Sequence, residues 1–224
     1  MEIIKDALKE GRKMLSEYES KKLLAHYGIP VTREIVVENL RQLKDAVSQI
    51  GYPLVLKAHS AQVAHKTEKG LVHVDIRNQE EAENAFKAIL EKLEDEDKAV
   101  LVQEMVKGQR ELVVGLTRDS QFGPCVMFGL GGIFTEILKD VSFRVAPLEK
   151  KDALEMMKEI KAHKILESVR GMPPADIELL SQILITVGQI GLEIEEIKEI
   201  DINPIILRGG GPVAVDALVV LESR

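Results

Sequence analysis

The sequence predicts a layered α/β protein with two subdomains. Between residues 31 and 105, strand-length apolar runs alternate with amphipathic segments of helical period, as expected for strands covered by helices. Near Glu104 the pattern changes to paired strands, followed by two helices and a last pair of strands. We therefore expect an N-terminal helix over 1–15, a first subdomain over 16–103 and a second over 104–224.

Helix-capping residues mark out the elements of the first subdomain. Ser16 and Glu19 have the spacing of a capping box, and Asn39 and Asn78 stand directly before amphipathic segments. Gly51 follows one of these segments, at the position where glycine most readily ends a helix. These signals predict helices over 16–25, 39–50 and 78–93, and strands over 31–37, 53–57, 70–76 and 99–105.

Turn residues mark out the second subdomain. The turn at 119–121 lies between apolar runs over 111–117 and 123–128, which predicts an antiparallel pair of strands. A glycine-rich turn at 208–211 predicts a second such pair near the end of the sequence. The remaining expected elements are a strand over 142–146, helices over 149–161 and 174–190, and strands over 197–207 and 213–221.

Composition limits the class of protein and its partners. Hydrophobic residues make up 45% of the 224 positions, and charges interrupt every apolar run before the roughly 18 residues that a membrane span needs. The first residues lack the apolar core of a signal peptide, so we expect a cytoplasmic protein with no membrane partner. The net charge of −7 and the lack of a basic block disfavour nucleic acid as a partner.

The stretch from Gly51 to Gly70 carries the first candidate chemistry. Its apolar run has the length of a strand and places Lys57 at the end of that strand, and His65 follows in a polar loop. Lysine holds a phosphate as a point charge, and a neutral imidazole is both a nucleophile and a proton carrier near pH 7. The pairing suggests phosphate chemistry, although a solvated edge lysine and a surface histidine would give the same pattern.

A glycine cluster at 129–132 is the second candidate. The sequence has no GxxxxGK[ST] loop, which excludes a P-loop NTPase, and the cluster lacks the spacing of a dinucleotide fingerprint. Its glycines could still expose backbone N–H groups to a phosphate. A turn that requires positive φ explains the same residues equally well.

The third candidate lies near the C-terminal end of the sequence. In a strand, the alternation of residues 199–203 projects Glu199, Asp201 and Asn203 from one face, and a hairpin through the glycine turn would bring Asp216 beside Asn203. Converging oxygen ligands suit Mg²⁺, which binds through one or two protein oxygens plus substrate phosphates. A polar strand face, or a buried acid satisfied by backbone groups, is the alternative interpretation.

Three stretches, in this order, resemble a single family. They are GYPLVLKAHSAQVAHKTEKG, the segment from Val102 to Leu148, and EIDINPI. Over about residues 15–222 the sequence resembles the ATP-grasp β subunit of ADP-forming acetate–CoA (acyl-CoA) synthetases, within the succinyl-CoA synthetase superfamily. The resemblance implies the ATP-grasp fold, an α/β (α+β) architecture whose two subdomains bind the nucleotide between them.

By position, the resemblance also implies roles for individual residues. His65 would be a phosphohistidine of the β subunit, and Glu68 would orient its imidazole. The other implied roles are nucleotide binding by Lys57, Glu104, Met105, Val106 and Glu111, phosphoryl binding by Gly131 and Gly132, and Mg²⁺ binding by Asn203 and Asp216.

The family further implies a reaction and a partner. Acyl-CoA, ADP and phosphate would be converted to a carboxylic acid, CoA and ATP, with Mg²⁺ as cofactor. A CoA-binding α subunit would carry the primary phosphohistidine in an α₂β₂ heterotetramer. Two other functions stay open, namely a regulatory nucleotide-binding module without phosphotransfer and a stand-alone ATP-grasp carboxylate–amine ligase that would not need His65.

Overall fold

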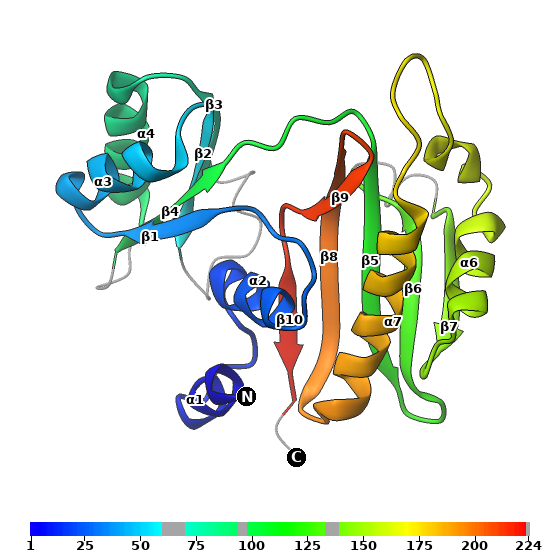
Figure 1. Cartoon of the computed structure of the whole chain (residues 1–224). Helices are drawn as coiled ribbons and strands as arrows, with labels where there is room; N and C mark the ends of the chain where they lie inside the picture. The colour runs from blue at the N-terminus through cyan, green and yellow to red at the C-terminus, as the bar shows by residue number, and fades with distance from the viewer. Residues whose placement is uncertain (60–69, 94–97, 133–138, 223–224) are drawn as a thin grey trace. The chain divides into compact units, whose positions relative to one another are not determined.

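The structure is a computed structural model of the protein, and its described residues form two compact units. The smaller unit contains Ser16–Tyr18 and Thr32–Met105, and the larger contains Met1–Leu15, Glu19–Val31 and Val106–Arg224. Both units pack helices on antiparallel sheets, which confirms the mixed α/β class (Figure 1). The described residues are 1–59, 70–93, 98–132 and 139–222.

A four-stranded antiparallel sheet with the order β1-β4-β2-β3 forms the smaller unit. Helices α3 (Leu40–Ile50) and α4 (Gln79–Lys92) pack on this sheet and share one hydrophobic cluster with it. The strands are β1 (Glu34–Val37), β2 (Leu54–His59), β3 (Val72–Ile76) and β4 (Ala99–Glu104).

Both asparagine caps expected from the sequence are confirmed. The side-chain oxygens of Asn39 and Asn78 accept hydrogen bonds from the N–H groups of Gln42 and Glu81, at 3.0 and 2.9 Å. Gly51 ends α3 with φ 82°, a left-handed conformation that glycine adopts without steric cost. Local sequence chemistry therefore sets the boundaries of these helices.

A six-stranded antiparallel sheet forms the larger unit, in the order β10-β8-β5-β6-β7 with β9 also paired to β8. Helices α6 (Lys150–Glu159) and α7 (Ile177–Glu193) pack on β5, β6 and β7 (Figure 1). The other elements are α1 (Glu2–Lys9), α2 (Glu17–His26), β5 (Glu111–Asp119), β6 (Gly123–Leu130), β7 (Val141–Val145), the 3₁₀ turn η1 (His163–Leu166), β8 (Ile197–Arg208), β9 (Gly211–Ala214) and β10 (Leu218–Leu221).

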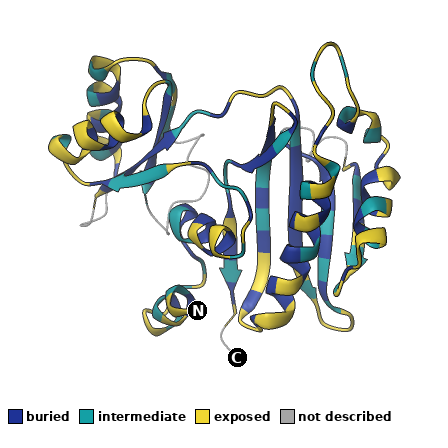
Figure 2. Cartoon of the chain, in the orientation of Figure 1, coloured by how far each residue is buried: buried dark blue, intermediate teal, exposed yellow. Residues whose placement is uncertain are grey.

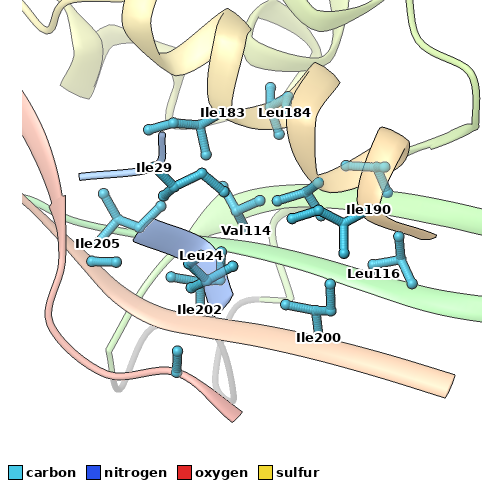
Figure 3. Packing of buried hydrophobic residues seen from close by; sticks show 14 of the residues in the cluster. Leu24, Ile29, Val114, Leu116, Ile183, Leu184, Ile190, Ile200, Ile202 and Ile205 are labelled. Atoms are coloured by element: carbon cyan, nitrogen blue, oxygen red, sulfur yellow. The ribbon is translucent and has the colours of Figure 1, made fainter. Parts of the chain in front are cut away.

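The core of the larger unit includes residues from the start of the sequence. Leu24 and Ile29 are buried in the same cluster as Val114 of β5 and Ile202 of β8, close to the apolar face of α7 (Figure 3). The segment 19–31 therefore belongs to the larger unit, whereas the sequence pattern predicts it within 16–103. The reason is non-local packing, since these apolar side chains are buried against strands that come much later in the sequence.

The C-terminal end also differs from the prediction. Residues 213–221 form two strands, β9 and β10, and not one, because the ladder is interrupted beside Pro204, which has no N–H to donate. Pro204 does not end its own strand, since β8 continues to Arg208. The segment between β9 and β10 therefore leaves the regular ladder at Val215–Ala217.

Around the middle of β8, buried Ile200 and Ile202 alternate with half-buried Asp201 and Asn203, and the helix faces toward the sheet are buried (Figure 2). Across the described parts of the protein, no helix has the length and apolar character needed to cross a membrane.

We expect Leu184→Ala in α7 to lower the free energy of unfolding by about 2–5 kcal/mol, because Leu184 is 0% exposed and its loss leaves a cavity. Leu192→Ala in the same helix should change it by less than about 0.5 kcal/mol, because Leu192 is 46% exposed. Urea denaturation of the two variants measures the difference. Equal losses would contradict the burial pattern.

Candidate functional site

The six-stranded sheet of the larger unit has one face packed by α6 and α7, and its opposite face carries both apolar side chains and the polar side chains of β8. Leu112, Val114 and Leu116 of β5 join the core cluster, so the residues between them point to the opposite face. There, side chains of β5, β6, β7 and β8 surround a hollow of about 190 Å³. Its lining includes Val113, Gly115, Thr117, Met127, Phe143, Glu199, Asp201 and Asn203.

The register of the last strands places Asp216 across from Asn203. Ile205 pairs with Ala214, and Asp201 pairs with Leu218. Between these pairs the N–H of Val215 donates to the carbonyl of Pro204 at 3.0 Å. The pairs on either side agree with the predicted juxtaposition of Asp216 and Asn203, although the connection through Val215 is not a regular strand.

Carboxylates crowd this edge of the hollow. Burial raises the pKa of Asp201 to about 6, and the negative charges of Glu199 and Asp216 add to the rise. Ionised Asp201 is therefore held in an environment that disfavours its charge. A cation bound here would relieve this repulsion, so the donor set fits a positively charged ligand.

Asn203 is fixed by the glycine cluster. Its side-chain oxygen accepts a hydrogen bond from the N–H of Gly132 at 2.9 Å, and the N–H of Gly131 donates to the carbonyl of Glu111 at 2.9 Å. A Cβ on Gly132 would strike the Glu111 carboxylate, and one on Gly131 would strike the backbone of Leu112. The structure thus brings Glu111, Gly131, Gly132 and Asn203 together, with both glycine N–H groups already bonded inside the protein.

Lys57 lies in the smaller unit and forms a buried ion pair. Its ammonium lies 2.6 Å from the Glu17 carboxylate, and the two side chains are 8% and 4% exposed. The sequence signals did not reveal Glu17 as a partner of Lys57, because forty positions of sequence separate the two. An ammonium has three N–H donors, so it can contact a carboxylate and a phosphate together.

The remaining predicted site residues fall in different places. In the smaller unit, the Glu104 carboxylate accepts hydrogen bonds from Arg33, and the N–H of Met105 donates to Pro53 at 3.1 Å. In the larger unit, Val106 packs with Ile206 and Val213. The catalytic candidates His65 and Glu68 lie outside the described residues.

The acidic group does not form a closed metal cage. In the described ranges, no three His, Cys, Asp or Glu side chains are placed to hold a metal. Two protein oxygens, from Asn203 and Asp216, nevertheless fit Mg²⁺, because this ion keeps several waters and takes further ligands from substrate phosphates. The amide oxygen of Asn203 has a second lone pair besides the one used by Gly132.

Comparison with known proteins places this geometry in a family. Residues 6–221 match the ATP-grasp domain family. The sequence is 49% identical to the β subunit of ADP-forming acetate–CoA ligase I of Pyrococcus furiosus, over 98% of this protein and 97% of that subunit. The protein therefore belongs to the ATP-grasp family, and it is similar along nearly its whole length to β subunits of ADP-forming acetate–CoA ligases.

A longer relative and a solved structure extend the comparison. The ADP-forming acetate–CoA ligase I of Archaeoglobus fulgidus is 40% identical over 98% of this sequence, which corresponds to 33% of that protein. A chain of the dinucleotide-forming acetyl-CoA synthetase 1 of Ca. Korarchaeum cryptofilum, solved with coenzyme A and Ca-AMPCP, superposes with a TM-score of 0.94 at 45% identity. The match covers 99% of this protein and 99% of that chain. Another structure of that enzyme contains Mg-AMPPCP and a phosphohistidine segment pointing towards the nucleotide site, with a TM-score of 0.88.

We predict that Asp201→Asn stabilises the metal-free protein at pH 7.5 by roughly 1–3 kcal/mol. The pKa of Asp201 is raised from 3.8 to about 6, so the folded state binds its proton more tightly than the unfolded state does. Ionised Asp201 therefore lowers the free energy of unfolding as pH rises from 3.8 to about 6. The advantage of the variant should disappear near pH 4. Denaturation at several pH values measures it.

Asp119→Asn is the matched control with the opposite sign. Hydrogen bonds from the Phe122 and Gln121 N–H groups lower the pKa of Asp119, so its ionised form stabilises the fold above its ordinary pKa. This variant should lose stability at pH 7.5 and approach the wild type as pH falls. If both variants shifted stability in the same direction at neutral pH, the electrostatic account of the hollow would be wrong.

Proposed function

We propose that this protein is the nucleotide-binding β subunit of an ADP-forming acyl-CoA ligase. It would pass a phosphoryl group from a CoA-binding α subunit to ADP, completing the conversion of acyl-CoA, ADP and phosphate to a carboxylic acid, CoA and ATP. The observation that carries the proposal is the gathering of Asp201, Asn203 and Asp216 on the open sheet face of a protein that is 49% identical to such a subunit.

Asn203 and Asp216 would hold Mg²⁺, and the ion, when bound, neutralises charge on the nucleotide phosphates. Asn203 is suited to this because its bond to Gly132 holds the amide in one orientation. Asp216 is held across from it by the backbone register on both sides. Asp201 would contribute negative charge near the ion.

Lys57 would contact the nucleotide phosphates, and Glu17 would position it. The 2.6 Å ion pair holds the ammonium at the strand in one place, which limits the entropy that phosphate binding would cost. Glu104, Met105 and Val106 would contact the adenine through their backbone. Glu111 would lie near the ribose or phosphate, and Gly131 and Gly132 near the incoming phosphoryl group.

The proposed relay uses His65, with Glu68 accepting the second ring N–H. A neutral imidazole nitrogen of His65 would attack the phosphorus carried by a histidine of the α subunit, so that one N–P bond forms as the other breaks. A terminal oxygen of ADP would then attack the same phosphorus, forming the O–P bond of ATP and releasing neutral His65.

The partner would be a separate CoA-binding α subunit in an α₂β₂ assembly. Support comes from the relative of Pyrococcus furiosus, which is itself a β subunit and is matched over 97% of its length. Such an assembly would act in the cytoplasm.

We expect His65→Ala to abolish labelling of this protein by γ-labelled ATP and Mg²⁺ in the presence of the α subunit. Wild-type label should be acid-labile and base-stable, as phosphohistidine is, and His26→Ala, an exposed histidine of α2, should label normally. Scintillation counting of the separated subunits gives the result. Persistent label in His65→Ala would place the phosphoryl group on another residue of this protein. Full turnover without His65 would favour the carboxylate–amine ligase alternative.

Asn203→Ala and Asp216→Asn should each raise the Mg²⁺ concentration needed for half-maximal ADP binding at least about tenfold, the effect expected for loss of one metal ligand. Titration calorimetry at a series of Mg²⁺ concentrations measures this. Glu222→Gln, which removes only an exposed partner of Lys198, is the control and should leave the Mg²⁺ requirement unchanged. An unchanged requirement in both site variants would place the metal elsewhere.

A further inference from the structure

Lys21 of α2 is a cation buried in the larger unit. It is 1% exposed and is among the largest fully buried side chains. Its ammonium donates a hydrogen bond to the backbone carbonyl of Val215 at 3.1 Å. Burying an ammonium costs several kcal/mol of desolvation, which an apolar side chain of similar length would avoid. The hydrogen bond to Val215 is one contact that offsets this cost, and it ties the ammonium to the backbone beside Asp216.

The carbonyl that Lys21 contacts belongs to the residue before Asp216. Val215 is held twice, because its N–H donates to Pro204 while its carbonyl accepts from Lys21. The segment 215–217 connects β9 to β10 and lies outside the regular ladders of those strands. The two bonds at Val215 therefore fix the backbone that carries the Asp216 carboxylate.

A second contact fastens α2 to the same region without touching Val215. The N–H of Val219 in β10 donates to the side-chain oxygen of Ser20 at 3.1 Å, in a buried position. Ser20 and Lys21 are neighbours on one helix, so both hold α2 against the last strands. Of these two contacts, the one from Lys21 acts on the residue adjacent to the proposed metal ligand.

We infer that Lys21 is a positioning residue for the Mg²⁺ site, setting the place of Asp216 through the Val215 carbonyl. The inference rests on the proposed function, in which Asp216 binds the metal. A positioning role differs from a purely structural role in one respect: loss of Lys21 changes the affinity for Mg²⁺ as well as the stability of the fold. Arginine, which keeps the charge and the donors, retains the role in part.

The test compares Lys21→Met, Lys21→Arg and Ser20→Ala. Two quantities are measured on the full-length protein, namely the Mg²⁺ concentration for half-maximal ADP binding by calorimetry and the thermal midpoint of unfolding without metal. Lys21→Met should raise the Mg²⁺ requirement roughly five- to tenfold, and Lys21→Arg should recover most of that loss. Ser20→Ala should lower the midpoint while leaving the Mg²⁺ requirement within about twofold, the change expected when the metal site is untouched.

The outcomes separate the inference from the proposed function. If Asp216→Asn raises the Mg²⁺ requirement but Lys21→Met lowers only the thermal midpoint, Lys21 is structural and the inference is overturned. If Asp216→Asn itself leaves the Mg²⁺ requirement for ADP binding unchanged, Asp216 is not a metal ligand. The result then contradicts the proposed function as well as the inference about Lys21. Should Lys21→Met not fold, Lys21→Gln decides the question. Its side chain is one bond shorter, so its amide does not replace the ammonium at the Val215 carbonyl and the Mg²⁺ requirement must still rise.

Discussion

In the larger unit α6 and α7 pack on one face of the sheet, and the site depends on what the opposite face carries. Strand geometry sends alternate residues to opposite sides, so the isoleucines of β8 pack under α7 while Glu199, Asp201 and Asn203 face away. That second face lines the hollow, and there it carries polar side chains that would be costly in the apolar core. The repulsion that raises the pKa of Asp201 follows directly.

On the face of the larger sheet that carries Asp201, the stability of the fold and the binding of a cation favour different side chains. Carboxylates placed close together weaken the metal-free fold, yet they are the groups a cation would bind. The structure limits the cost by fixing neighbouring groups with neutral hydrogen bonds, from Gly132 to Asn203 and from Val215 to Pro204. In the smaller unit, Glu17 compensates the buried charge of Lys57. Natural proteins commonly concentrate such locally unfavourable choices at functional sites.

Local chemistry made much of the fold and part of the site predictable. Asn39, Gly51 and Asn78 determine helix ends through their own caps, and the alternation around Asp201 predicted which side chains share a face. The hairpin that brings Asp216 opposite Asn203 follows from the glycine turn. These features depend on residues a few positions apart, and this is why the sequence pattern reveals them. Features that depend on distant contacts were not predictable, because nothing around Leu24, Glu17 or Lys21 shows which strands they meet.

The most direct measurement of the central claim is paramagnetic broadening of backbone amide signals by Mn²⁺ bound with ADP in place of Mg²⁺. If the open face of the larger sheet is the metal site, the signals of residues 201–203, 215–217 and Gly132 should be lost first, while those of the turn at 119–122 should persist. Broadening centred elsewhere in the protein, or none when ADP is bound, would contradict the account.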